Sequence, residues 1–172
     1  MNFDVKKLVS NAFYTALYVV LCYVFQPISF GAIQVRIAEA LCVLPIFDKT
    51  AVISITLGCF LSNFLFSSIY DAIFGTLATF IGLLFIVFIK KDNFYIGFKD
   101  KKIKIDAFFV RMLPTIISNA VIVPFVIKYA FGDTMPLLLI AATVGIGEII
   151  SIYGLGYILY NALIRTKLYK NV

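Results

Sequence analysis

Five charged side chains stand within or at the ends of long apolar stretches: Arg36, Glu39, Asp71, Arg111 and Glu148. A carboxylate in apolar surroundings can accept hydrogen bonds from a ligand or hold a proton, and it is a functional candidate by default. Histidine is absent, which excludes histidine-based acid–base catalysis, a Ser-His-Asp triad and histidine metal sites. Any acid–base or ion-pair chemistry within the apolar stretches therefore depends on these five side chains.

Glu148 is the most informative of these residues because it lies near the middle of the longest apolar run, without a lysine or arginine on the same expected helix. It is either a protonated side chain bonded to a neighbouring helix or part of a ligand or proton site. Gly145 and Gly147 precede it, and glycines permit close approach by a ligand or by another helix.

Arg36 and Glu39 are three residues apart and share one helix face. Either they neutralise each other and hold a short helix in place, or one or both line a ligand cavity. Asp71 either caps the start of a helix or joins the same site. Arg111 lies near an expected helix start, where its long side chain can reach the membrane surface, so it is left out of the site.

Two amides in apolar runs complete the candidate site. Under the expected topology, these amides and four of the charged residues occupy the outer half of a helix bundle: Arg36, Glu39, Asn63, Asp71, Asn119 and Glu148. Carboxylates and amides with aromatic walls suit a flat polar heterocycle, because a carboxylate can accept two N–H bonds from a guanine-like edge and aromatic rings stack on its face.

The composition requires a membrane around these residues. Of 172 residues, 62% are hydrophobic and 14% are charged, with a mean hydropathy of +1.02. A soluble domain of this size has too little interior to bury so much apolar surface. We therefore expect one integral-membrane domain over residues 1–172, a multi-pass protein of a cell membrane.

Six apolar segments have the length or character of spanning helices, which need about 20 mostly apolar residues. The expected all-α bundle has helices at 8–27, 32–47, 50–67, 71–90, 107–130 and 135–164. If six spans alternate, nearly all lysines outside them fall on one side, and the positive-inside rule makes both termini cytoplasmic. The polar segment 90–106 is expected to be a solvated loop at the lipid surface, with docking of a partner as the alternative.

Several features are missing from the sequence. No G-x-x-x-x-G-K-[ST] motif occurs, so the chain does not hydrolyse ATP by a P-loop mechanism. Cys22, Cys42 and Cys59 stand singly in apolar runs and are expected to be buried small hydrophobes. We expect no catalytic residue, metal, cofactor or nucleic-acid partner. As a stand-alone pump the chain would need an energy source that its sequence does not contain.

The charged motifs resemble those of the QueT family. The run from Ile33 to Pro45 resembles the signature R-x-x-E-A-L-x-x-L-P, and Asp71 to Thr79 resembles D-x-x-F-G-x-L-A-T. Weaker similarities follow at Gly58-Cys59-Phe60 with Asn63, Pro114-Thr115 with Asn119 and Pro124, and Gly147-Glu148 with Gly154. Members of this family are S-components of energy-coupling factor (ECF) transporters, assigned to the uptake of queuosine precursors, so the resemblance implies the cell membrane of a prokaryote.

The resemblance implies a six-helix S-component that holds a 7-deazaguanine-type ligand, such as a queuosine precursor or queuine, near the extracellular side. It also implies a transmembrane coupling subunit and two ATPase subunits as partners. In this superfamily a small-residue motif on the first helix packs against the coupling subunit, and Ala12 and Ala16 match that position. The hypothesis is that Glu148 or Glu39 reads the N–H edge, Asn63 and Asn119 supply amide bonds, and Arg36 orients Glu39.

Three other functions are compatible with parts of the sequence. The chain could be an S-component for a different vitamin or micronutrient, because one fold can bind diverse ligands. It could be an intramembrane enzyme that uses Glu39, Asp71 and Glu148 as acid–base groups, although no nucleophile accompanies them. It could also be a structural membrane subunit.

Overall fold

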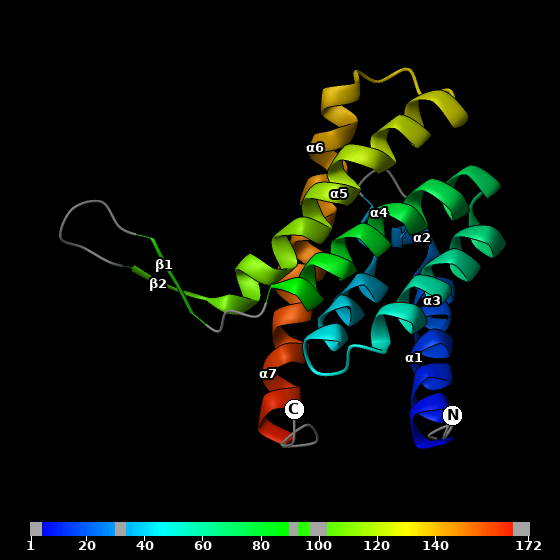
Figure 1. Cartoon of the computed structure of the whole chain (residues 1–172). Coiled ribbons are helices and arrows are strands. Elements are labelled where there is room, and N and C mark those ends of the chain that lie inside the picture. The colour runs from blue at the N-terminus through cyan, green and yellow to red at the C-terminus, as the bar shows by residue number, and fades with distance from the viewer. Residues whose placement is uncertain (1–4, 30–33, 90–92, 97–102, 167–172) are drawn as a thin grey trace.

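The chain is a helical bundle with one short hairpin, seen in a computed structural model that describes residues 5–29, 34–89, 93–96 and 103–166 (Figure 1). The elements, in chain order, are α1 (Val5–Val24), α2 (Gln26–Ser29), η1 (Ile37–Ile46), α3 (Ala51–Phe66), α4 (Ile69–Phe88), β1 (Asn93–Ile96), β2 (Ile103–Asp106), α5 (Ala107–Ala130), α6 (Leu137–Glu148), η2 (Ile149–Gly156) and α7 (Tyr157–Thr166).

Four continuous helices are long and apolar enough to cross a membrane: Val5–Val24, Ile69–Phe88, Ala107–Ala130 and Leu137–Thr166. The apolar helices η1 and α3 are shorter, with 10 and 16 residues. The expectation of a multi-pass helical membrane protein is therefore confirmed. The arrangement of six spans with cytoplasmic termini stays a prediction, although α1 begins and α7 ends at the same end of the bundle (Figure 1).

The second expected helix is where the sequence prediction was wrong. Instead of an α-helix over 32–47, the chain has no regular secondary structure at 34–36, with an extended backbone at Arg36, and then forms η1, a 3₁₀-helix that starts at Ile37. Pro45 lies inside η1, whose ten residues rise about 20 Å at the 3₁₀ pitch. This segment is therefore too short to span the apolar core, which is about 30 Å thick.

The polar segment between α4 and α5 contains the only strands in the described part of the chain. β1 and β2 pair antiparallel, with Asn93 opposite Asp106 and Ile96 opposite Ile103. The hairpin projects away from the bundle in Figure 1. The fold is otherwise all-helical in the described residues, as expected, and most lysines of the expected loop lie outside them.

Helix packing places α4 between α3 and α5, while α1 packs on α3 and η1 packs on η2. Glycines allow two of these contacts, since a Cβ at Gly58 would lie 2.8 Å from Tyr18 Cβ and one at Gly82 would lie 2.4 Å from Thr115 Cα. The main core is built from large side chains that include Tyr18, Ile55, Leu83, Ile86, Phe108, Met112 and Ile152.

The last long helix is continuous but changes its winding. After α6 the residues Ile149–Gly156 form a π-helix, η2, before α-helical winding resumes in α7. π-Helical turns inside α-helices occur often at functional sites. Here η2 begins directly after Glu148, one of the predicted site residues.

Candidate functional site

All six predicted site residues are buried in the protein. Their exposed fractions are 4% or less: Arg36, Glu39, Asn63, Asp71, Asn119 and Glu148. They come from the extended segment at 34–36, η1, α3, α4, α5 and α6. Residues more than 100 positions apart in sequence therefore contribute to one polar region in an otherwise apolar bundle.

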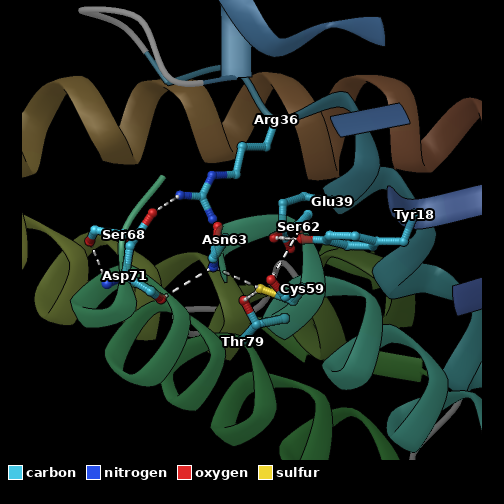
Figure 2. A network of polar contacts seen from close by, with 9 residues as sticks. All are labelled: Tyr18, Arg36, Glu39, Cys59, Ser62, Asn63, Ser68, Asp71 and Thr79. Carbon is cyan, nitrogen blue, oxygen red and sulfur yellow. Dashed lines mark hydrogen bonds and ion pairs between the residues drawn. The ribbon is translucent and has the colours of Figure 1, made fainter. Parts of the chain in front are cut away.

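An ion pair connects two of these elements. Arg36 Nη2 lies 3.0 Å from Asp71 Oδ2, and both side chains are about 95% buried (Figure 2). The helix cap at this point is Ser68, whose hydroxyl oxygen accepts from the backbone N–H of Asp71 at 3.1 Å. The interpretation of Asp71 as the cap was therefore wrong. The helix begins two residues earlier, and the carboxylate of Asp71 binds Arg36.

Glu39 is held by a different set of donors. The hydroxyl of Tyr18 donates to Glu39 Oε1 at 2.5 Å, and the thiol of Cys42 donates to Oε2 at 2.9 Å. The spacing of Arg36 and Glu39 allowed a self-contained pair, but the ion pair of Arg36 is made with α4. Glu39 and Arg36 still interact electrostatically at longer range.

Asn63 joins α3 to the ion pair. Its Nδ2 donates to the backbone oxygen of Asp71 at 3.3 Å and to Cys59 Sγ at 3.4 Å (Figure 2). Gly75 makes room for this arrangement, since a Cβ there would lie 2.9 Å from Asp71 Oδ1 and 3.1 Å from Asn63 Nδ2. The glycine thus leaves room for the Asn63 amide and the Asp71 side chain where α3 meets α4.

Glu148 and Asn119 form the other part of the site. Asn119, Glu39 and Arg36 all lie close enough to interact electrostatically with the Glu148 carboxyl group. Glu148 Oε2, Asn119 Nδ2 and Asn63 Oδ1 are buried without a hydrogen-bond partner among the described residues. Buried polar atoms are nearly always paired in folded proteins, so this set of two acceptors and one donor is suited to a polar ligand.

Sequence reasoning missed the roles of Tyr18, Cys42 and Cys59. The three cysteines are buried and free, as expected, but Cys42 and Cys59 also hydrogen-bond within the polar network. The spacing of Cys42, three residues after Glu39, was a usable signal. Tyr18 lies in an apolar run with nothing in the sequence to connect it to Glu39.

Ala12 and Ala16 lie apart from this site, on the outer surface of α1. Both are exposed, whereas Tyr18 and Cys22 on the same helix are buried. α1 is fixed to α3 by a hydrogen bond in which Thr15 Oγ1 donates to the backbone oxygen of Ser54 at 3.0 Å. The pattern A-x-x-x-A therefore faces outward.

The fold and the apolar helices around the buried polar cluster are those of a multi-pass helical membrane protein. The family model described as QueT transporter matches residues 8–165. The chain belongs to this family, whose members are transporters and not catalysts. A curated relative, the "Queuosine precursor transporter QueT" of Lactococcus lactis subsp. cremoris (strain MG1363), is 33% identical over 171 residues, covering 96% of this chain and 93% of the relative. No solved structure matches the chain.

Proposed function

We propose that this protein is the substrate-binding S-component of an ECF-type importer and that it captures a queuosine precursor or a related 7-deazaguanine base. The observation that carries the proposal is the buried, unpartnered acceptor and donor set at Glu148, Asn119 and Asn63, in a chain of the QueT transporter family. The name of the relative supplies the substrate class.

The chemistry of a 7-deazaguanine fits this set. Its pyrimidinone edge presents N–H donors beside a carbonyl acceptor. Glu148 Oε2 would accept from the N–H groups, and Asn119 Nδ2 would donate to the carbonyl oxygen. Asn63 Oδ1 would accept from a further ligand N–H. We assign Glu148 in preference to Glu39 as the reading carboxylate, because both oxygens of Glu39 already accept bonds from Tyr18 and Cys42.

Arg36 and Asp71 would then support the site as a fixed ion pair. The sequence hypothesis made Arg36 the residue that orients Glu39, whereas its direct partner is Asp71. An ion pair with about 95% of each side chain buried requires good geometry to offset the loss of hydration. Its role in the proposal is to keep η1 and α4 in place around the ligand.

The partners in the proposal are a transmembrane coupling subunit and two ATPase subunits. They supply the ATP hydrolysis for which this sequence has no P-loop motif. The exposed Ala12 and Ala16 on α1 would be the surface that packs against the coupling subunit, since small residues allow helices to approach closely. A groove of about 660 Å³ between α1, η1 and α7 opens beside this surface.

The test is binding of a ligand panel to the purified, detergent-solubilised protein, with the variant Glu148→Gln alongside. The panel contains preQ0, preQ1, queuine, guanine, riboflavin, thiamin and biotin. We expect tight binding confined to the deazaguanines. The variant should bind about tenfold or more weakly, because a hydrogen bond to a charged group contributes roughly 1.5–3 kcal/mol.

Two other results would change the proposal. Binding of a vitamin would keep the S-component assignment but replace the substrate, since the same fold can serve different ligands. Unchanged deazaguanine affinity in Glu148→Gln would remove the carboxylate readout.

A further inference from the structure

Gly147 marks the point where two distant parts of the chain touch through their backbones. A Cβ built on Gly147 would lie 2.2 Å from the carbonyl oxygen of Gln34 and 2.7 Å from its carbonyl carbon. Real Cβ atoms essentially never approach so closely, and backbone atoms cannot rotate away as a side-chain end can. Only glycine therefore fits at position 147 while the segment crosses here.

Both sides of this crossing lead directly into the candidate site. Arg36 follows Gln34 by two residues, and Glu148 follows Gly147 by one. Figure 2 shows the chain that carries Arg36 running across the gold-brown helix formed by α6 and η2, with the guanidinium group directed to Asp71. The crossing thus sets the distance between the Arg36–Asp71 ion pair and the Glu148 carboxyl group.

The segment at 34–36 lies outside any helix, and its backbone is extended at Arg36. Its path is therefore not set by the regular hydrogen bonds of a helix, and the packing against α6 has a larger share in fixing it. Arg36 is 4% exposed, and its long side chain ends at the buried carboxylate of Asp71. A shift of the backbone at Gln34 would be transmitted to that ion pair.

We propose that Gly147 is a positioning residue for substrate binding, because its missing side chain lets the Gln34–Arg36 segment and Glu148 assemble one site from two ends of the sequence. This inference rests on the proposed function. It assigns to Gly147 a role that neither helix thinning nor membrane packing alone would give.

The same continuous helix supplies matched controls. A Cβ on Gly154 would meet nothing within 4 Å, and one on Gly145 would meet only Ala120 Cβ at an ordinary 3.6 Å. Alanine at either position changes helix propensity in the same way as alanine at 147. The three variants therefore differ mainly in what the added methyl group meets.

The experiment measures the Kd of the panel deazaguanine that the unaltered protein binds best, for Gly147→Ala, Gly145→Ala and Gly154→Ala. We expect Gly147→Ala to bind about tenfold or more weakly, the loss expected when one charged hydrogen bond is misaligned. The two controls should stay within about twofold, as substitutions away from special features usually do. Equal affinities of all three variants would overturn the inference.

A second readout separates positioning from general damage to the fold. Gly147→Ala is also measured in the Glu148→Gln background. If Gly147 acts by placing Glu148 against the ligand, the two losses are not additive, because the second change removes an interaction already weakened. If Gly147→Ala weakens binding by the same factor in both backgrounds, its role is structural alone, and the proposal is contradicted.

Variants at Gln34 keep the inference testable if Gly147→Ala does not fold. The contact uses the backbone of Gln34, so Gln34→Ala should bind like the unaltered protein. Gln34→Gly should bind about threefold more weakly, because glycine gives the extended segment more conformational freedom. Equal binding by these two variants would overturn the inference, whereas an unaltered protein that binds no member of the panel overturns the proposed function, and the inference with it.

Discussion

At the scale of single residues, Glu39 is a buried carboxylate that the protein satisfies by itself. It is fully buried, and each of its oxygens accepts a bond from a neutral donor, one on Tyr18 and one on Cys42. A buried acceptor that loses its donor costs more than the net contribution of the bond, because it cannot return to water. Glu39 therefore has the properties of a structural group more than of a ligand group.

This reasoning gives a prediction for Tyr18→Phe. The change removes only the hydroxyl group that donates to Glu39 Oε1 and should destabilise the protein by about 1–3 kcal/mol. Thermal unfolding of the detergent-solubilised protein should show a lower Tm. Tyr129→Phe is the matched control, since Tyr129 is 76% exposed. If both variants unfold at the temperature of the unaltered protein, the bond to Glu39 contributes nothing measurable.

The burial of the six candidate residues was predictable from their types, but their pairing was not. All six predicted residues are buried, because a charged or amide group in an apolar run has to be buried with partners or a ligand. Spacing along one helix suggested Arg36 with Glu39, whereas the ion pair joins η1's leading segment to α4. Partners on different helices depend on packing, which a single sequence does not specify.

At the scale of elements, the ends of the long apolar helices were predicted to within about three residues, and 107–130 matches α5. The errors lie in apolar segments whose backbone conformation is not specified by hydropathy. Apolar composition over 32–47 could not distinguish an α-helix from an extended segment followed by η1. The π-helical winding of η2 also has no signature in hydropathy, because it changes the register of a helix and not its composition.

The packing of α4 against α5 gives a second prediction. In Gly82→Ala, the added methyl group would lie 2.4 Å from the Cα of Thr115, which is too close for either helix to keep its place. Overpacking of this kind costs about 1–3 kcal/mol, so a lower Tm is expected. Gly154→Ala, with open space around it, serves as the control. A Gly82→Ala protein as stable as the control would mean that α4 and α5 can separate without cost.

At the scale of the whole molecule, α1 joins the internal site to the outer surface. Its inner side carries Tyr18, which binds Glu39, and its outer side carries Ala12 and Ala16. Large apolar side chains are exposed along the same helix, among them Val9, Phe13 and Val20. One helix thus contacts the polar cluster through Tyr18 and carries the proposed docking surface on its outer side.

Substitutions on this outer surface should separate transport from binding. Ala12→Leu or Ala16→Leu should abolish uptake of the queuosine precursor in cells that contain the coupling and ATPase subunits, because a bulky side chain prevents close helix approach. Ligand affinity of the purified variants should be unchanged. Val20→Leu is the control for added volume on the same helix, since Val20 is already 53% exposed. Normal uptake by the two leucine variants would contradict the proposal that a coupling subunit docks on this surface.

All three thiols are buried, so reagents that react with cysteine cannot reach those in the polar cluster. Cys22, Cys42 and Cys59 are at most 1% exposed. A maleimide probe should therefore label a cysteine introduced at an exposed position such as Tyr129 without replacement of the native ones. Labelling of Cys42 or Cys59 during substrate uptake would in turn report that the bundle has opened around Glu39. The native thiols can therefore be used to detect a conformational change without an engineered cysteine.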